Sequence, residues 1–214
     1  MPIHQPIPAE QPYQPFPDVA RRNFMQRHVE IPLMVRALGL SGGGRVLEIG
    51  CGRGVGLSAL SHVLRPALLV GLDVDAALLA EARKRLALEG VPARLELGDA
   101  RALPFTAASF DLVIDFGTCY HIARPSAALR EIVRVLAAGG LFVSETVSSQ
   151  LLSHPWRTRG RRLPWSAAPE LSVVRRGILW KARRRGEGYY CGGSQHISER
   201  EVPHEGREDL RVRS

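Results

Sequence analysis

The feature that most constrains the fold of this chain is the alternation, between residues 45 and 147, of short apolar runs with segments of helical periodicity. A short apolar run that stops in glycine is typical of a buried strand, and apolar residues three and four apart are typical of an amphipathic helix. Alternation of the two indicates a parallel sheet covered by helices. The sequence therefore predicts an α/β fold.

The pattern predicts five strands, with helices or irregular segments between them. The predicted strands are 45–49, 67–72, 93–97, 110–116 and 141–147, and the predicted helices run from 55 to 64, 75 to 89 and 125 to 137. Because parallel crossovers are right-handed, strands 1 to 3 wind one way and strands 4 and 5 the other, which gives a Rossmann-like, doubly wound, mainly parallel sheet of order 3-2-1-4-5. Ligands in such sheets bind where the winding reverses, at the carboxyl ends of the strands.

A glycine-rich turn follows the first strand at that place. The turn reads Gly50-Cys51-Gly52-Arg53-Gly54. Glycine at alternate positions lets the backbone turn sharply and approach a ligand closely. Asp73 ends the next strand, 21 residues after Gly52, where a carboxylate can accept hydrogen bonds from a ribose diol. We interpret the pair as a nucleoside site; the alternative is a helix-packing turn beside a solvated aspartate.

The spacing of the turn argues against a phosphorylated coenzyme. Dinucleotide sites usually show G-x-G-x-x-G, but here Val55 stands where the third glycine of that pattern belongs. Glu48 adds negative charge where a phosphate would have to lie. A nicotinamide-dependent dehydrogenase, which shares this fold class, is therefore disfavoured.

These segments resemble the class I S-adenosylmethionine-dependent methyltransferases, in particular the type found in ubiquinone and menaquinone biosynthesis. The resemblance lies in five segments in order: VLEIGCGRG at 46–54, GLDVD at 71–75, GDARALPF at 98–105, FDLVIDFGTCYHI at 110–122 and EIVRVLAAGGLFVSET at 131–146. It implies that S-adenosylmethionine is the cofactor and that the chain is an enzyme that methylates a small-molecule acceptor by in-line displacement.

The resemblance also implies cofactor-binding residues. Gly50, Cys51 and Gly52 would approach the methionine portion, Asp73 the ribose, Val74 one face of the adenine, and Asp99 with Ala100 its edge. Glu48 and Asp115 would add to an acidic rim, which suits a cationic nucleoside. Two alternatives stay open: Asp99 as a turn residue, and Asp115 as a buried structural carboxylate.

The displacement needs no metal, and it needs a base only if the acceptor carries a proton. His121 has a suitable ordinary pKa for that base, and Tyr120 could orient an acceptor. The alternative for His121 is a capping or packing role. A nucleophilic role for Cys119 is disfavoured because methyl transfer needs no covalent enzyme intermediate.

Three regions are expected: a proline-rich irregular arm over 1–17, the cofactor-binding domain with N-terminal helices over 18–150, and a basic, partly disordered extension over 151–214. The extension holds 14 Lys and Arg against 7 Asp and Glu, almost all of the net charge of +8. The folded body is therefore nearly neutral, which disfavours a nucleic-acid-binding domain.

The C-terminal strand pair of the related enzymes is uncertain or missing in this sequence. If it is missing, the alternative function is a cofactor-binding module without catalysis. Trp156, Trp165 and Trp180 would line an acceptor pocket or pack over the sheet edge. The absence of a long apolar run and of a signal-like N-terminus predicts a cytoplasmic protein without membrane insertion, and the oligomeric state is not readable.

Overall fold

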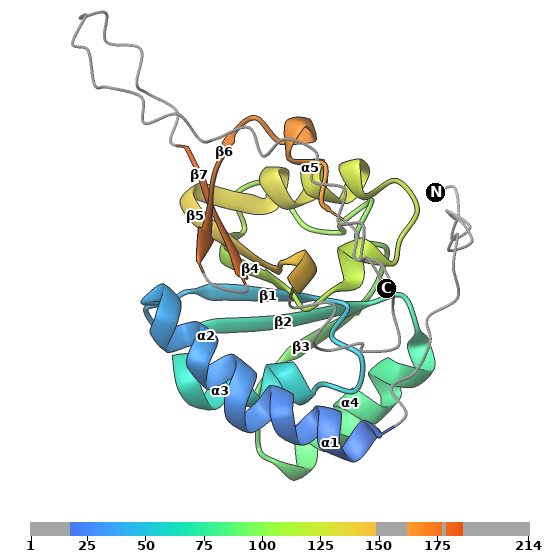
Figure 1. Cartoon of the computed structure of the whole chain (residues 1–214). Helices are drawn as coiled ribbons and strands as arrows, with labels where there is room; N and C mark the ends of the chain where they lie inside the picture. Colours follow the sequence, from blue (N-terminus) through green and yellow to red (C-terminus); the bar gives the residue numbers. More distant parts are fainter. Residues whose placement is uncertain (1–17, 149–161, 177–178, 186–214) are drawn as a thin grey trace, which may run out of the picture.

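The computed structural model describes residues 18–148, 162–176 and 179–185, and its centre is a seven-stranded sheet (Figure 1). The strand order is β3-β2-β1-β4-β5-β7-β6, so the predicted order 3-2-1-4-5 is confirmed. These five strands are parallel, and β7 is antiparallel to both of its neighbours. The strands are β1 (Arg45–Ile49), β2 (Leu68–Asp73), β3 (Arg94–Leu97), β4 (Phe110–Asp115), β5 (Leu136–Glu145), β6 (Leu171–Arg176) and β7 (Leu179–Arg184).

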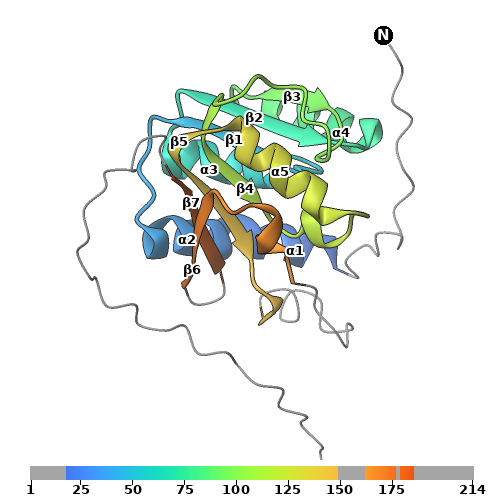
Figure 2. The ribbon, with the colours of Figure 1, turned by 90° about the horizontal axis from the view of Figure 1, so that it is seen from above.

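Helices cover both faces of the sheet (Figures 1 and 2). One core cluster packs α2, α3 and α4 on one face, and the other packs α5 and η3 on the opposite face. In β1, Val46 belongs to the first cluster and Leu47 and Ile49 to the second, as strand alternation requires. The helices are α1 (Val19–Met25), the π-helical turn η1 (Gln26–Glu30), α2 (Ile31–Leu38), α3 (Val55–Leu64), α4 (Ala76–Leu88), and α5 (Pro125–Val135), with the short 3-10 turns η2 (Thr118–Tyr120) and η3 (Trp165–Ala167).

The structure answers the question left open about the C-terminal strand pair. The antiparallel strands β6 and β7 are present, and they extend the sheet beyond β5. Trp165 packs between Phe142 of β5 and Trp180 of β7, with ring centroids 6.1 and 5.9 Å away. Of the two roles considered for the tryptophans, packing over the sheet is the one seen for Trp165 and Trp180, while Trp156 lies outside the described residues.

The predicted boundary between the helix at 125–137 and the strand at 141–147 is wrong. The predicted helix to residue 137 ends at Val135, and β5 begins at Leu136 instead of Leu141. Gly139 and Gly140 do not mark the end of the helix; they lie inside β5. Gly139 adopts a φ of 74°, and the pairing of β4 with β5 shifts register beside the two glycines, so they form an irregularity within the strand. The two N-terminal helices are likewise joined, through the π-helical turn that precedes Pro32.

Candidate functional site

A cavity of about 690 Å³ lies at the carboxyl ends of the parallel strands, where the winding of the sheet reverses. Its size is in the range usual for small-molecule sites. The glycine turn after β1 and the loops after β2, β3 and β4 form most of the wall, and one side comes from Val19, Arg22 and Asn23 of α1 with Gln26 of η1. The predicted ring of strand ends therefore surrounds a single cavity.

The glycine turn has the left-handed backbone that its sequence suggests. Gly50, Gly52 and Gly54 all have positive φ angles, of 68°, 49° and 75°. A Cβ atom on Gly50 would lie 1.8 Å from Oγ1 of Thr118, so the turn also packs too tightly against η2 for a side chain. Only glycine meets both requirements at position 50.

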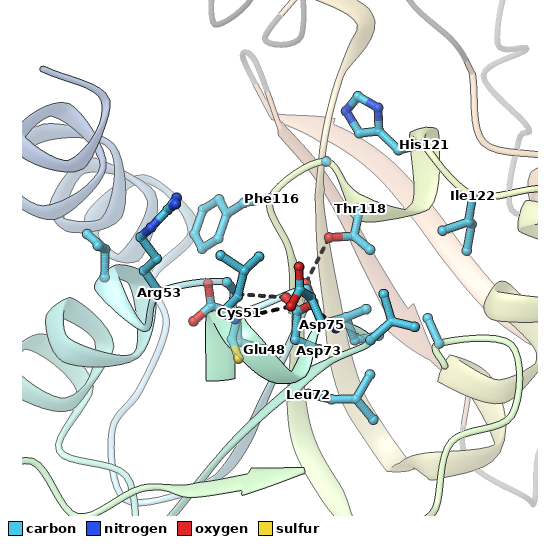
Figure 3. A pocket seen from close by; sticks show the side chains of 18 of the residues that line it. Glu48, Cys51, Arg53, Leu72, Asp73, Asp75, Phe116, Thr118, His121 and Ile122 are labelled. Atoms are coloured by element: carbon cyan, nitrogen blue, oxygen red, sulfur yellow. Dashed lines mark hydrogen bonds between the residues drawn. The ribbon is translucent and has the colours of Figure 1, made fainter. Parts of the chain in front are cut away.

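Asp73 joins this turn to the loop after β2. Its Oδ2 accepts a hydrogen bond of 2.8 Å from the backbone N–H of Gly52, and its Oδ1 accepts one of 2.9 Å from that of Asp75. Both loops line the cavity, with Cys51 from one and Asp73 and Asp75 from the other (Figure 3). Val74, in the loop after β2, is 61% exposed. The carboxylate is thus fixed at the wall with lone pairs left for a ligand.

Glu48 is a buried carboxyl in the same wall. Its side chain is 2% exposed, and among the described residues its Oε2 has no hydrogen-bond partner. Burial and, secondarily, the charge of Asp73 raise the pKa of Glu48 to about 8. A Cβ atom on Gly56 would lie 2.1 Å from Oε1, so α3 needs a glycine where the carboxyl packs against it. A cation in the cavity would favour the ionised form of this group.

Asp99 and Ala100 follow β3 and line the cavity, as does Arg101, which the sequence reasoning missed. The Arg101 side chain donates from Nε to Asp99 at 2.9 Å, and its backbone N–H donates to the same carboxylate at 2.8 Å. This pairing raises the pKa of Arg101. Asp99 therefore acts both as a turn residue and as part of the wall.

Asp115 and Tyr120 do not belong to the cavity lining. The carboxylate of Asp115 is buried, and it accepts hydrogen bonds from the backbone N–H groups of Thr118, at 2.6 Å, and Cys119. Burial raises its pKa to about 6. The Tyr120 hydroxyl donates to the main-chain oxygen of Glu145. Both residues hold η2 in place, which is the structural alternative considered for Asp115.

His121 does line the cavity. It follows η2, and its backbone N–H donates to the Thr118 carbonyl at 2.9 Å. Figure 3 shows its ring well apart from the carboxylates of Glu48 and Asp73. The cysteines at 51 and 119 are buried, and burial raises the pKa of both thiols, which disfavours thiolate chemistry.

The contribution of α1 was not predicted from the sequence. Its cavity-lining residues recur at helical spacing, but they are mostly polar, so they gave no signal of a buried face. Arg22 donates to Glu30 at 2.7 Å, and Arg27 makes a two-bond ion pair with Glu89 beyond α4, at 2.9 Å for each bond. Ion pairs therefore fasten this helical segment, since α1 buries none of its side chains.

The residues that the structure describes contain no group of three His, Cys, Asp or Glu side chains arranged to hold a metal ion. None of their helices combines the length and apolar character needed to cross a bilayer.

Comparison with known proteins gives relatives for this part of the chain. A family model described as a methyltransferase domain matches residues 47–144. The phthiotriol/phenolphthiotriol dimycocerosates methyltransferase of Mycobacterium tuberculosis (strain H37Ra) is 43% identical over 104 residues, 47% of this chain and 37% of that protein. The fatty-acid O-methyltransferase of Mycolicibacterium smegmatis is 39% identical over 101 residues, 47% of this chain and 36% of that protein.

A solved structure of a SAM-dependent methyltransferase from Aquifex aeolicus matches with a TM-score of 0.58 and 14% identity, over 76% of this chain and 92% of that one. This likeness concerns the fold. The chain spans little more than a third of the length of the two mycobacterial relatives, and the ubiquinone and menaquinone type stays a prediction. Residues 47–144 thus match a methyltransferase domain, and the strand order and glycine turn are those that the resemblance to class I S-adenosylmethionine-dependent methyltransferases predicts.

Proposed function

We propose that this chain transfers a methyl group from S-adenosylmethionine to a small, lipid-like acceptor. The observation that carries the proposal is the cavity itself, in which an aspartate fixed at the end of β2 and a buried glutamate of β1 flank a glycine turn with positive φ angles; among the described residues, one carboxyl oxygen of that glutamate has no hydrogen-bond partner. This arrangement suits a cationic nucleoside without phosphates.

The residues of the wall would hold the cofactor in a defined direction. Asp73 would accept hydrogen bonds from the ribose hydroxyls, and Val74 would cover one face of the adenine. Asp99, held by Arg101, would meet the adenine edge, while the glycine turn would approach the methionine portion. Glu48 would supply a negative charge near the sulfonium, because a nearby cation favours its ionised form.

When bound, the cofactor supplies an activated methyl group and a neutral thioether leaving group. The chain would contribute orientation, by holding the acceptor on the far side of the methyl carbon from the sulfur. The wall near β4 offers apolar side chains for such an acceptor, including Phe116 and Ile122, with His121 beside them. Tyr120, which is buried behind this wall, would position η2 rather than touch the acceptor.

The relatives support a lipid-like acceptor, since their names specify phthiotriol or phenolphthiotriol dimycocerosates and fatty acids. The alternative of a binding module without catalysis depended on an incomplete C-terminal region. The presence of β6 and β7 removes that reason. The cytoplasmic location and the absence of a nucleic-acid partner stay predictions.

Calorimetric titration with S-adenosylmethionine and S-adenosylhomocysteine tests the proposal. We expect both to bind and Asp73→Ala to weaken binding by about 10- to 100-fold, because hydrogen bonds to a charged group are worth roughly 1.5–3 kcal/mol. Glu96→Gln, in β3 and paired with Arg94 outside the cavity, is the control and should bind as the unmodified chain does. Equal affinities for all three proteins would contradict the assignment of the cavity.

Asp73→Ala also removes the bonds to Gly52 and Asp75, so thermal unfolding should accompany the titration. Transfer of labelled methyl groups from the cofactor to a lipid extract then tests the reaction. Tight cofactor binding without transfer to any extract would favour the binding module.

A further inference from the structure

Glu145, at the end of β5, is a buried carboxyl for which the proposed function has no use so far. Its side chain is 3% exposed, and among the described residues its Oε2 has no hydrogen-bond partner. Buried polar groups are normally satisfied, so an exception calls for an explanation. Burial raises the pKa of Glu145 to about 8, which is near the value that suits a proton acceptor at neutral pH.

The carboxyl lies directly behind a residue of the cavity wall. A Cβ atom built on Gly117, which lines the cavity after β4, would be 3.3 Å from Glu145 Oε2. With a φ of 100°, position 117 strongly favours glycine, so no side chain stands between the backbone of the wall and the carboxyl. The hydrogen bond from Tyr120 to the main-chain oxygen of Glu145 holds the end of β5 against η2.

The position of Glu145 fits the side from which an acceptor must come. Asp73 and Asp99 would hold the nucleoside at the β2 and β3 side of the cavity, so the methyl group would point toward β4. In-line displacement requires the acceptor beyond that methyl group, hence on the side of β4 and β5. These two strands are neighbours in the sheet (Figure 1), and Glu145 is the last residue of β5.

On the basis of the function proposed above, we propose that Glu145 is the general base for an acceptor that carries a hydroxyl group. The Oε2 atom takes the hydroxyl proton while the acceptor oxygen bonds to the methyl carbon. The carbon–sulfur bond breaks, and its electron pair stays on sulfur as a neutral thioether. The proton on Glu145 then passes to water once the product has left.

The surroundings of Glu145 control its charge. Arg22 of α1 favours the ionised form, whereas Asp115 and Glu30 oppose it. In the present structure Oε2 is buried, so an acceptor reaches it only if the chain around it moves. The side that carries Arg22 is suited to such movement, because α1 buries no side chain of its own.

The test compares two acceptors of equal chain length, a long-chain alcohol and the corresponding fatty acid. The alcohol must lose a proton, but the fatty acid is already a carboxylate at neutral pH and needs no base. Single-turnover methyl transfer is measured between pH 6 and 9 with the unmodified chain, Glu145→Gln and the control Glu96→Gln. Cofactor affinity and thermal unfolding are measured for each protein.

We expect Glu145→Gln to slow methylation of the alcohol by about 100-fold or more, the usual contribution of a general base. Methylation of the fatty acid and cofactor affinity should change less than about twofold. In the unmodified chain, the rate with the alcohol should rise with pH up to about 8 and then level off, while the rate with the fatty acid stays flat. This profile needs no variant, so it holds even if Glu145→Gln folds poorly.

Equal slowing with both acceptors, no slowing with either, or transfer to the fatty acid alone would overturn the role of Glu145 and leave the methyltransferase proposal intact. Bound cofactor without transfer to either acceptor would count against the lipid-like acceptor, and the role of Glu145 would fall with it.

Discussion

Replacing Glu48 by glutamine should change how the stability of the protein depends on pH. The pKa of Glu48 rises from an ordinary 4.5 to about 8 on folding, chiefly because the side chain is buried. The folded chain therefore binds a proton there that the unfolded chain releases. Such a group contributes stability that is fully present below pH 4.5 and is lost as the pH rises to about 8.

The size of this loss follows from the shift. Each pH unit within the window lowers the free energy of unfolding by about 1.4 kcal/mol, so between pH 5 and pH 7.5 Glu48 accounts for a loss of about 3 kcal/mol. Glutamine has nearly the same shape but no charge in either state. The Glu48→Gln variant should therefore gain about 3 kcal/mol relative to the unmodified chain over the same interval. Glu145 is present in both proteins, so its similar effect cancels in the difference.

Urea unfolding followed by circular dichroism at pH 5, 6, 7 and 7.5 measures this difference, and measurements at pH 3 and 4 are added for the control. Glu131→Gln is the control of opposite sign, because the hydrogen bond from Arg134 lowers the pKa of Glu131. The stability that Glu131 contributes is present above the ordinary glutamate pKa and is lost as the pH falls. The free energy of unfolding of Glu131→Gln should therefore rise relative to that of the unmodified chain only in acid. Parallel stability curves for the unmodified chain and Glu48→Gln would refute the reasoning.

Two other substitutions test the walls of the cavity. Gly50→Ala should reduce affinity for S-adenosylhomocysteine at least tenfold by calorimetry, because its Cβ would collide with Thr118 and its φ is positive; unchanged affinity would show that the turn adapts. Arg27→Ala removes the ion pair with Glu89, which should change the free energy of unfolding by less than about 1 kcal/mol but speed amide hydrogen exchange over residues 19–30. Exchange at the original rate would mean that α1 is held in place by other contacts.

Much of the sheet could be predicted from the sequence because buried parallel strands are short apolar runs and helices separate them. The hairpin of β6 and β7 could not. Leu171–Arg176 reads LSVVRR and Leu179–Arg184 reads LWKARR, so neither strand alternates strictly between apolar and polar residues and both end in two arginines. In a basic segment this pattern resembles a solvated tail. Their pairing with β5 depends on contacts distant in sequence, such as Lys181 opposite Val143, which local patterns do not reveal.

The parts of the candidate site that could be predicted are those whose role depends on backbone conformation. The glycine turn and Asp73 could be found from spacing alone, since their role depends on φ angles and strand ends. Arg22 and Glu145 could not, because what matters for each is burial and neighbours contributed by other elements. Asp115 shows the converse: a carboxylate at the expected strand end turned out to face backbone amides of the next turn.

The place of β7 inside the sheet also affects how the protein can be made. The strand that pairs with the outer edge of β5 is synthesised after the outermost strand β6, so a growing chain that has completed the first five strands still has that edge of β5 unpaired. At the usual 5–20 residues per second, translation from residue 145 to residue 184 takes roughly 2–8 s. During that interval the nascent domain presents an open ladder of amides and carbonyls, and a stalled or truncated product would keep it as a template for self-association.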